Sequence, residues 1–222
     1  MKKYCVMTAF VFLMVFGTKT GVMAQNPVLM SVNMYKNVSS AGETYGISFD
    51  LSNDALKKAT RVYIKGPKGA RIWVNNTLDL NDMALSALNL PLDEFNRWFP
   101  EGKYIFTLSP NIYGTLSVSM THNFPPTPAV TFPLDGSIGV PTNPVITWAP
   151  ITGIAGLQLQ LKDNADFVFS TGLPINATSY AVPANLLKLN TQYELSLRAR
   201  TTASNENGLT TTMIISFTTV TQ

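Results

Sequence analysis

The chain has 222 residues, of which 45% are hydrophobic and only 13% are charged, and it contains a single cysteine. Globular proteins average about 25% charged residues, so this chain is poor in charge without having the composition of a disordered protein. Its formal charge is +3, but three of its sixteen basic residues lie within the first 24 positions, and the remainder carries thirteen residues of each sign. This balance argues against a nucleic-acid-binding protein, which would present a strongly basic domain. It also removes any whole-chain attraction to an anionic membrane surface.

The first 24 residues have the features of a cleaved signal peptide. Two lysines follow the first methionine, residues 5–16 form an apolar run, and small or β-branched residues precede a cleavage site before Gln25. The run is shorter than the roughly 20 residues of a membrane-spanning helix, so we expect no stable membrane insertion after cleavage. Because Cys5 lies in this segment, the mature chain has no cysteine, and we expect neither a disulfide nor a thiolate metal site. The sequence predicts an exported protein, in the periplasm or outside the cell.

A proline-rich break divides the rest of the chain into two β-rich halves. Three prolines lie within residues 125–128, a density that excludes helix and opposes pairing in the middle of a sheet. Short runs of β-forming residues, separated by Gly, Pro, Asn and Asp, fill both halves. We therefore expect an all-β protein of two β-sandwich domains in tandem. The expected limits are an N-terminal domain at 25–124, a linker at 125–128 and a C-terminal domain at 129–222.

Seven short strands are expected in the C-terminal half. Alternation of apolar and polar residues is clearest at 157–161 and 193–199, which predicts half-buried strands there. The seven segments are 130–132, 145–148, 157–161, 167–169, 180–182, 193–199 and 213–217. Their number and spacing are typical of a β-sandwich, and we expect Trp148 and Tyr193 to have structural roles in its core.

Three segments of this half follow a known pattern, namely 133–148, the run 187–193 that ends in Tyr193, and 216–219. On these segments, residues 128–219 resemble a bacterial fibronectin type III or related immunoglobulin-like module. The resemblance implies that Tyr193 occupies the position of a tyrosine corner. It implies a fold and no particular function, because one fold serves many functions.

The N-terminal half is expected to contain one short helix. The segment 92–99 predicts this helix, with acidic residues in its first turn and a proline after it. A strand is expected at 103–108, with its aromatic residues on one face. The stretch 99–107, running on into the linker and the C-terminal half, resembles uncharacterised secreted bacterial proteins of this two-part build. That resemblance concerns architecture only.

A hairpin in the same half has a register that can be argued from its side chains. The segments 61–65 and 71–74 flank a glycine-containing loop, which is the pattern of a β-hairpin. Placing Lys65 opposite Arg71 gathers the apolar side chains of both strands on one face. Because a slip of one residue moves a strand's apolar set to the other face, we expect this register. It requires an odd-numbered loop, with Gly69 available for a left-handed conformation.

In that register, the opposite face of the hairpin holds a candidate ligand site. The site residues are Arg61, Tyr63, Lys65, Arg71 and Trp73. Three further lysines are close in sequence, namely Lys57, Lys58 and Lys68, and no acidic residue occurs between Asp54 and Asp79. An aromatic pair within a basic surface can stack on sugar rings while binding carboxylate or sulfate groups. The alternative is a solvated charged face in which Trp73 packs under a neighbouring loop or strand.

We expect no catalytic residue, no metal site and no cofactor. His122 is the sole histidine, and we interpret it as a linker residue because no Gly-x-Ser-x-Gly motif accompanies it. We interpret Asp93 and Glu94 as stabilising the start of a helix, and 163–166 as a surface loop rather than a calcium site. Carboxylates that meet only in space stay open as a possibility.

The sequence thus predicts an exported, non-catalytic protein of the binding or adhesion type. Its expected partner is an extracellular polysaccharide or an envelope protein, and not a nucleic acid. Two alternatives stay open. One is a structural or chaperone-like assembly subunit of the envelope, which edge strands would serve, and the other is a carboxylate-dependent hydrolase.

Overall fold

The structure is a computed structural model that describes residues 29–52, 56, 58–69, 71–75, 82–110, 115–163, 166–203 and 208–221. The predicted signal peptide at 1–24 lies outside these ranges. The chain divides into two compact units. The first unit contains the chain up to Asn33 together with Gly46–His122, and the second contains Met34–Tyr45 together with Asn123–Gln222.

Strands form nearly all of the regular structure, so the protein is all-β, as the sequence predicts. The elements in chain order are β1 (Leu29–Ser39), β2 (Gly42–Ser52), β3 (Arg61–Lys65), the short turn η2 (Pro67–Gly69), β4 (Arg71–Asn75), β5 (Asp82–Leu90), α1 (Leu92–Trp98), β6 (Gly102–Ser109), β7 (Thr115–Met120), β8 (Val130–Phe132), β9 (Ser137–Val140), β10 (Val145–Trp148), β11 (Gly156–Asp163), β12 (Asp166–Leu173), β13 (Ser179–Ala181), β14 (Gln192–Arg200) and β15 (Leu209–Thr219). In the described part of the chain, no helix has the length and apolar character needed to cross a membrane.

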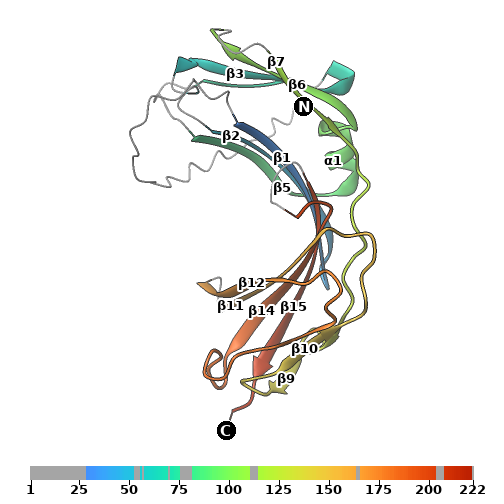
Figure 1. The fold of residues 1–222 in the computed structure, drawn as a ribbon, viewed down its shortest axis with the longest axis vertical. Coiled ribbons are helices and arrows are strands. Elements are labelled where there is room, and N and C mark those ends of the chain that lie inside the picture. The colour runs from blue at the N-terminus through green and yellow to red at the C-terminus, as the bar shows by residue number, and fades with distance from the viewer. Residues whose placement is uncertain are drawn as a thin grey trace, which may run out of the picture. The chain divides into compact units, whose positions relative to one another are not determined.

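The first unit has two layers of strands (Figure 1). One layer is the antiparallel sheet β4-β3-β6-β7, and the other contains β1, β2 and β5. Aromatic side chains fill the space between the layers. The ring centroid of Phe49 on β2 lies 5.9 Å from that of Tyr104 and 5.7 Å from that of Phe106, both on β6. Burial of each such side chain stabilises the fold by about 1.5–3 kcal/mol.

The predicted helix at 92–99 is confirmed as α1. Two acidic residues lie in its first turn, where they interact favourably with the helix dipole. Phe95 is its one buried residue, and its ring lies 6.0 Å from that of Phe99. The Phe99 N–H still donates to the Phe95 carbonyl at 2.8 Å, and Pro100 follows directly. Proline cannot continue the helix, so the chain turns from here into β6.

The second unit is a β-sandwich (Figure 1). One sheet contains β12, β11, β14, β15 and β1 in that order, with β9 also pairing with β15, and the other sheet has the order β13-β10-β8. The core lies between them and contains Trp148 from β10 together with Leu159, Leu197 and Phe217 from the larger sheet. The alternation that predicted strands at 157–161 and 193–199 places Leu159 and Leu197 on the inner face.

Trp148 and Tyr193 are both buried in this core and both retain hydrogen bonds. Their exposed fractions are 3% and 1%. The Trp148 indole N–H donates to the Ala177 carbonyl at 2.8 Å. The Lys188 backbone N–H donates to the Tyr193 hydroxyl, also at 2.8 Å. The polar atom of each ring therefore has a partner, which removes the cost of burying it.

The C-terminal half contains one strand more than the seven predicted. This strand, β9, pairs in parallel with β15. Ile138 within it is 84% exposed, and Gly139 has a φ of +73°. Ile138 and Val140 do alternate with Ser137 and Gly139, but the run is only four residues long and lies between Gly136 and Pro141, so its sequence also fits a turn.

The observed units differ from the predicted domain limits at Met34–Tyr45, which we placed in the N-terminal domain. This segment belongs to the second unit because β1 pairs in parallel with β15. The pairing runs from Met34 opposite Leu209 to Val38 opposite Met213. Pairing of strands so distant in the chain leaves no local signal in the sequence.

The predicted linker at 125–128 also lies within the second unit. Pro125 is buried, and its carbonyl accepts a hydrogen bond from the Thr211 hydroxyl at 2.7 Å. Just before it, the ring of Phe124 lies 5.7 Å from that of Tyr45 in an edge arrangement. Pro125 and Pro128 are therefore buried within the second unit, whereas Pro126 is exposed.

Candidate functional site

The predicted register of the hairpin is confirmed. Strands β3 and β4 pair with Tyr63 opposite Trp73 and with Lys65 opposite Arg71. Val62 and Ile64 are buried, so the inner face of β3 is apolar. The charged and aromatic residues consequently share the outer face, because successive side chains of a strand point to opposite faces of the sheet.

The loop of the hairpin is held against β6. It contains η2, in which Lys68 and Gly69 have positive φ values of 51° and 83°, so the expected left-handed conformation at Gly69 is confirmed. A Cβ atom added to Gly102 would lie 2.7 Å from Cγ of Pro67. The absence of a side chain at Gly102 thus allows the loop to rest on the start of β6.

Trp73 is the most distinctive side chain of this face, because it is 63% exposed. Tyr63 beside it is partly exposed, and Lys65 and Arg71 are exposed. The alternative interpretation, in which Trp73 packs under a neighbouring loop or strand, does not describe this conformation. An exposed tryptophan within a polar surface commonly marks a contact site.

Positive charge is concentrated around the aromatic pair. Lys65 and Arg71 are directly opposite each other, and like charges in that position repel. Lys58 and Lys68 are also exposed, whereas Lys57 lies outside the described residues. The Arg61 guanidinium differs from the others, because its Nε–H donates to Asn75 Oδ1 at 3.0 Å.

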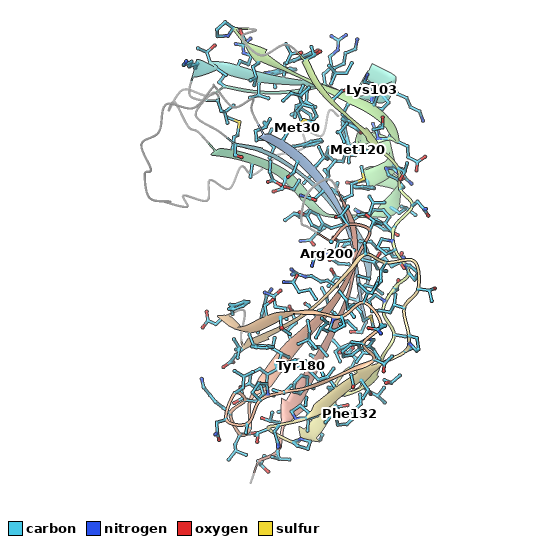
Figure 2. The ribbon with its side chains drawn as sticks, viewed as in Figure 1. Met30, Lys103, Met120, Phe132, Tyr180 and Arg200 are labelled. Carbon is cyan, nitrogen blue, oxygen red and sulfur yellow. The ribbon has the colours of Figure 1, made fainter. Side chains whose placement is uncertain are left out.

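The same face continues over β6 and β7, which lie outside the candidate site expected from the sequence. Thr107 pairs with Tyr63, and Thr115 pairs with Thr107, so hydroxyl groups extend the aromatic row across the sheet. Lys103, labelled in Figure 2, lies on the same face and is exposed. The alternation of Thr and Ser with apolar residues at 115–120 is the signal that could have identified β7.

We call this surface the basic-aromatic face. It consists of the outward residues Arg61, Tyr63, Lys65, Arg71, Trp73, Asn75, Lys103, Ile105, Thr107, Ser109, Thr115, Ser117 and Ser119. None of these described positions is acidic. The face can therefore offer cations, two aromatic rings and hydroxyl groups to a ligand without repelling an anion.

His122, the candidate that a catalytic triad would need, is engaged within the first unit. Its Nε2 lies 2.9 Å from the Phe99 carbonyl oxygen, and its ring centroid lies 5.0 Å from that of Phe95. Its backbone N–H donates to a carboxylate oxygen of Glu101. These contacts tie the end of the first unit to α1 and the start of β6.

The carboxylates singled out in the sequence are dispersed. Asp93 and Glu94 are exposed in the first turn of α1. Asp163 ends β11, and its carboxylate lies 3.7 Å from Lys188 Nζ, while residues 164 and 165 are not described. Among the described residues, no three His, Cys, Asp or Glu side chains cluster in a way that could hold a metal ion.

The chain was also compared with known proteins. No family model matches it, and no curated protein does. Among solved structures, it is similar to the BSP domain of a biofilm-associated protein, with 13% sequence identity and a TM-score of 0.27 over 88% of this chain, and it spans 29% of that structure's length. It is also similar to a segment of two fibronectin type III domains from chicken tenascin, with 10% identity and a TM-score of 0.29 over 77% of this chain and 91% of that one. At these values, neither similarity carries information about what the chain binds.

Proposed function

We propose that the chain is an exported, non-catalytic binding protein of the adhesion type, whose basic-aromatic face recognises an anionic polysaccharide. The observation that supports this most directly is the exposure of Trp73, 63% of which is accessible in a row shared with Tyr63. A tryptophan ring that is exposed to this extent contributes little to the stability of the fold, whereas it is available to contact a ligand.

The chemistry of the face fits a charged sugar polymer. Aromatic rings stack on the apolar faces of sugar rings, and guanidinium groups bind carboxylate or sulfate through paired hydrogen bonds. A bound anion would also relieve the repulsion between Lys65 and Arg71 across the hairpin. The hydroxyl groups of Thr107 and Thr115 continue the aromatic row and can bond to sugar hydroxyls.

Binding to dextran sulfate and to uncharged dextran, which share a backbone, tests the proposal. We expect the protein to bind the sulfated polymer and to lose affinity as salt is added, because salt screens exposed charges. The double variant Tyr63→Ala/Trp73→Ala should bind at least about tenfold more weakly, as expected for loss of aromatic contacts at a binding site.

Two matched controls accompany this experiment. Trp98→Ala removes a tryptophan that is 43% exposed on α1 and lies outside the face. Lys188→Gln removes an exposed lysine of the second unit. Both should bind as the unchanged protein does. Equal binding by the double variant, while it stays folded, would overturn the proposal.

One observation favours the assembly-subunit alternative. Strand β12 ends its sheet, and in the described part of the chain it pairs only with β11. Phe167 within it is 63% exposed. An open edge with an exposed aromatic residue can accept a strand from another protein. The variant Phe167→Lys tests this alternative. If it neither binds nor co-assembles with a candidate client protein but still binds dextran sulfate, the assembly-subunit function is favoured.

A further inference from the structure

The outward side chains of the sheet β4-β3-β6-β7 are arranged in rows that run across its strands. One row consists of Trp73, Tyr63, Thr107 and Thr115, because each of these residues is the pairing partner of the next. We call it the aromatic row. It begins on β4 and ends on β7, the two edge strands of this sheet among the described residues. Neighbouring strands are about 4.8 Å apart, so the row extends over about 14 Å.

The two aromatic rings follow one another only in the direction across the strands. Along β3, the outward neighbours of Tyr63 are Arg61 and Lys65. On β4, the outward neighbours of Trp73 are likewise polar or charged. A polymer that followed one strand would therefore meet a single ring. A polymer that crosses the strands meets Trp73 and then Tyr63, so stacking of successive sugar units favours the crossing direction.

The cations of the hairpin lie beside the aromatic row and not within it. Lys65 and Arg71 are two residues away from the rings along their strands on one side, and Arg61 is two residues away on the other side. Two residues correspond to roughly 7 Å along a strand. The acidic groups of a linear polysaccharide project sideways from its backbone. A polymer in the row would therefore direct these groups toward the cations on either side.

The part of the row on β6 and β7 can hold further sugar units but supplies little charge. Thr115 is exposed and Thr107 is partly exposed, so a polymer can reach both side chains. Their hydroxyl groups can each donate and accept a hydrogen bond, as the hydroxyl groups of a sugar do. Of the outward residues on β6 and β7, only Lys103 is charged. The charged and stacking contacts are therefore concentrated at the β3–β4 end of the row.

We infer that the anionic polysaccharide crosses all four strands along the aromatic row, and that Thr107 and Thr115 form a second subsite beyond the two rings. This inference rests on the function proposed above, and it adds the direction of the polymer and the length that is recognised. A row of about 14 Å accommodates about three sugar units of an extended chain. A disaccharide can therefore occupy the rings but cannot fill both subsites.

Binding of two heparin oligosaccharides, a disaccharide and an octasaccharide, tests the second subsite. The octasaccharide should bind the unchanged protein more tightly. Thr107→Val/Thr115→Val removes both hydroxyl groups and keeps the branched shape of the side chains. We expect this variant to bind the octasaccharide roughly fivefold to thirtyfold more weakly, as for the loss of two hydrogen bonds. Its affinity for the disaccharide should change by less than about twofold.

Thr115→Glu is a second variant, which does not depend on the strength of those hydrogen bonds. An acidic side chain at this end of the row repels the part of an anionic polymer that lies over β7, so octasaccharide binding should weaken at least about fivefold. Ser119 provides the matched controls, because it is exposed on the same face of β7 and lies outside the aromatic row. Ser119→Ala should bind both lengths as the unchanged protein does. Ser119→Glu should weaken octasaccharide binding less than Thr115→Glu does, because salt screens the more distant charge.

A loss confined to the octasaccharide in either threonine variant supports the second subsite. Unchanged octasaccharide binding in both folded variants would overturn the inference and would place the polymer on β3 and β4 alone. Equal weakening for the two lengths would also overturn it. Both of these results leave the proposed function intact if Tyr63→Ala/Trp73→Ala loses binding to dextran sulfate. Unchanged dextran sulfate binding in that double variant would instead overturn the proposed function, and this inference with it.

Discussion

Pro67 rests directly on Gly102, so that a Cβ atom added to Gly102 would lie 2.7 Å from Pro67 Cγ. This contact joins the loop of the β3–β4 hairpin to the start of β6, and Gly102 has a φ of +134°. Both the space and the backbone conformation therefore require glycine. The contact positions the end of the basic-aromatic face at which Lys65, Arg71 and Lys103 lie.

We expect Gly102→Ala to destabilise the protein by roughly 1–3 kcal/mol, because an alanine there is strained and collides with the loop. Gly172→Ala is the matched control, since an added Cβ at Gly172 meets nothing within 4 Å, and it should change stability by less than about 0.5 kcal/mol. Urea unfolding of both variants measures the difference. Equal stability of the two would show that the contact with Pro67 does not constrain the loop.

Trp73 and Trp148 should differ sharply in their effect on stability. Trp73→Ala removes an exposed ring and should change the free energy of unfolding by no more than about 0.5 kcal/mol. Trp148→Ala should cost about 3–5 kcal/mol, because it empties a buried site and removes the donor to the Ala177 carbonyl. Denaturant unfolding of both variants tests this. A loss of several kcal/mol in Trp73→Ala would assign that ring to the fold rather than to a ligand.

Tyr193→Phe should destabilise the second unit by about 1–2 kcal/mol. The substitution keeps the ring but removes the hydroxyl oxygen that accepts from the Lys188 N–H, leaving that donor without its partner. Tyr180→Phe is the control, because Tyr180 is half-buried and stacks on Phe169 with centroids 5.7 Å apart through its ring alone. Thermal unfolding should show a lower Tm for Tyr193→Phe only. A matching decrease in Tyr180→Phe would contradict the assignment.

Asp135 should make stability depend on pH in the acid range. The Ser216 backbone N–H donates to its carboxylate at 2.8 Å and is the main reason why the pKa of Asp135 is lowered. A carboxyl group whose pKa is lower in the folded state than in the unfolded state stabilises the fold at pH values above its unfolded-state pKa. This stabilisation is lost as the pH falls through the folded-state pKa. Because Asp135 is exposed, we expect its contribution to be about 1 kcal/mol or less.

Thermal unfolding from pH 7 down to pH 2 measures this dependence. Asp135→Asn should flatten the acid part of the curve. Ser216→Ala should retain most of the dependence, because it removes only the hydroxyl contact at 3.3 Å and keeps the backbone donor. An acid limb that is the same in Asp135→Asn and in the unchanged protein would show that another group is responsible.

Local patterns predicted those parts of the fold whose partners are near in sequence. The register of the hairpin followed from Val62 and Ile64, because only one register places them on the same face of the sheet as the apolar residues of β4. The helix followed from its acidic first turn and the proline after it. In contrast, β9 is only four residues long, contains Gly139 and is flanked by Gly136 and Pro141, so its sequence does not distinguish a strand from a turn.

The candidate site was predicted in part. The hairpin residues were found because they alternate with apolar neighbours. Lys103 and Thr107 were not assigned to the site, since the order of strands in a sheet cannot be read from one strand's pattern.

The parallel pairing of β1 with β15 has a consequence for how the protein is made. The second unit needs Met34–Tyr45, which pairs with a strand more than 160 residues further along, so this unit can be completed only after Leu209–Thr219 has been synthesised. A fragment that begins after the prolines would lack Met34–Val38 and would leave Leu209–Met213 as an open edge, prone to pair with other molecules. The two units are therefore not independent building blocks, and neither could be inherited or exchanged by a simple cut at the proline-rich segment.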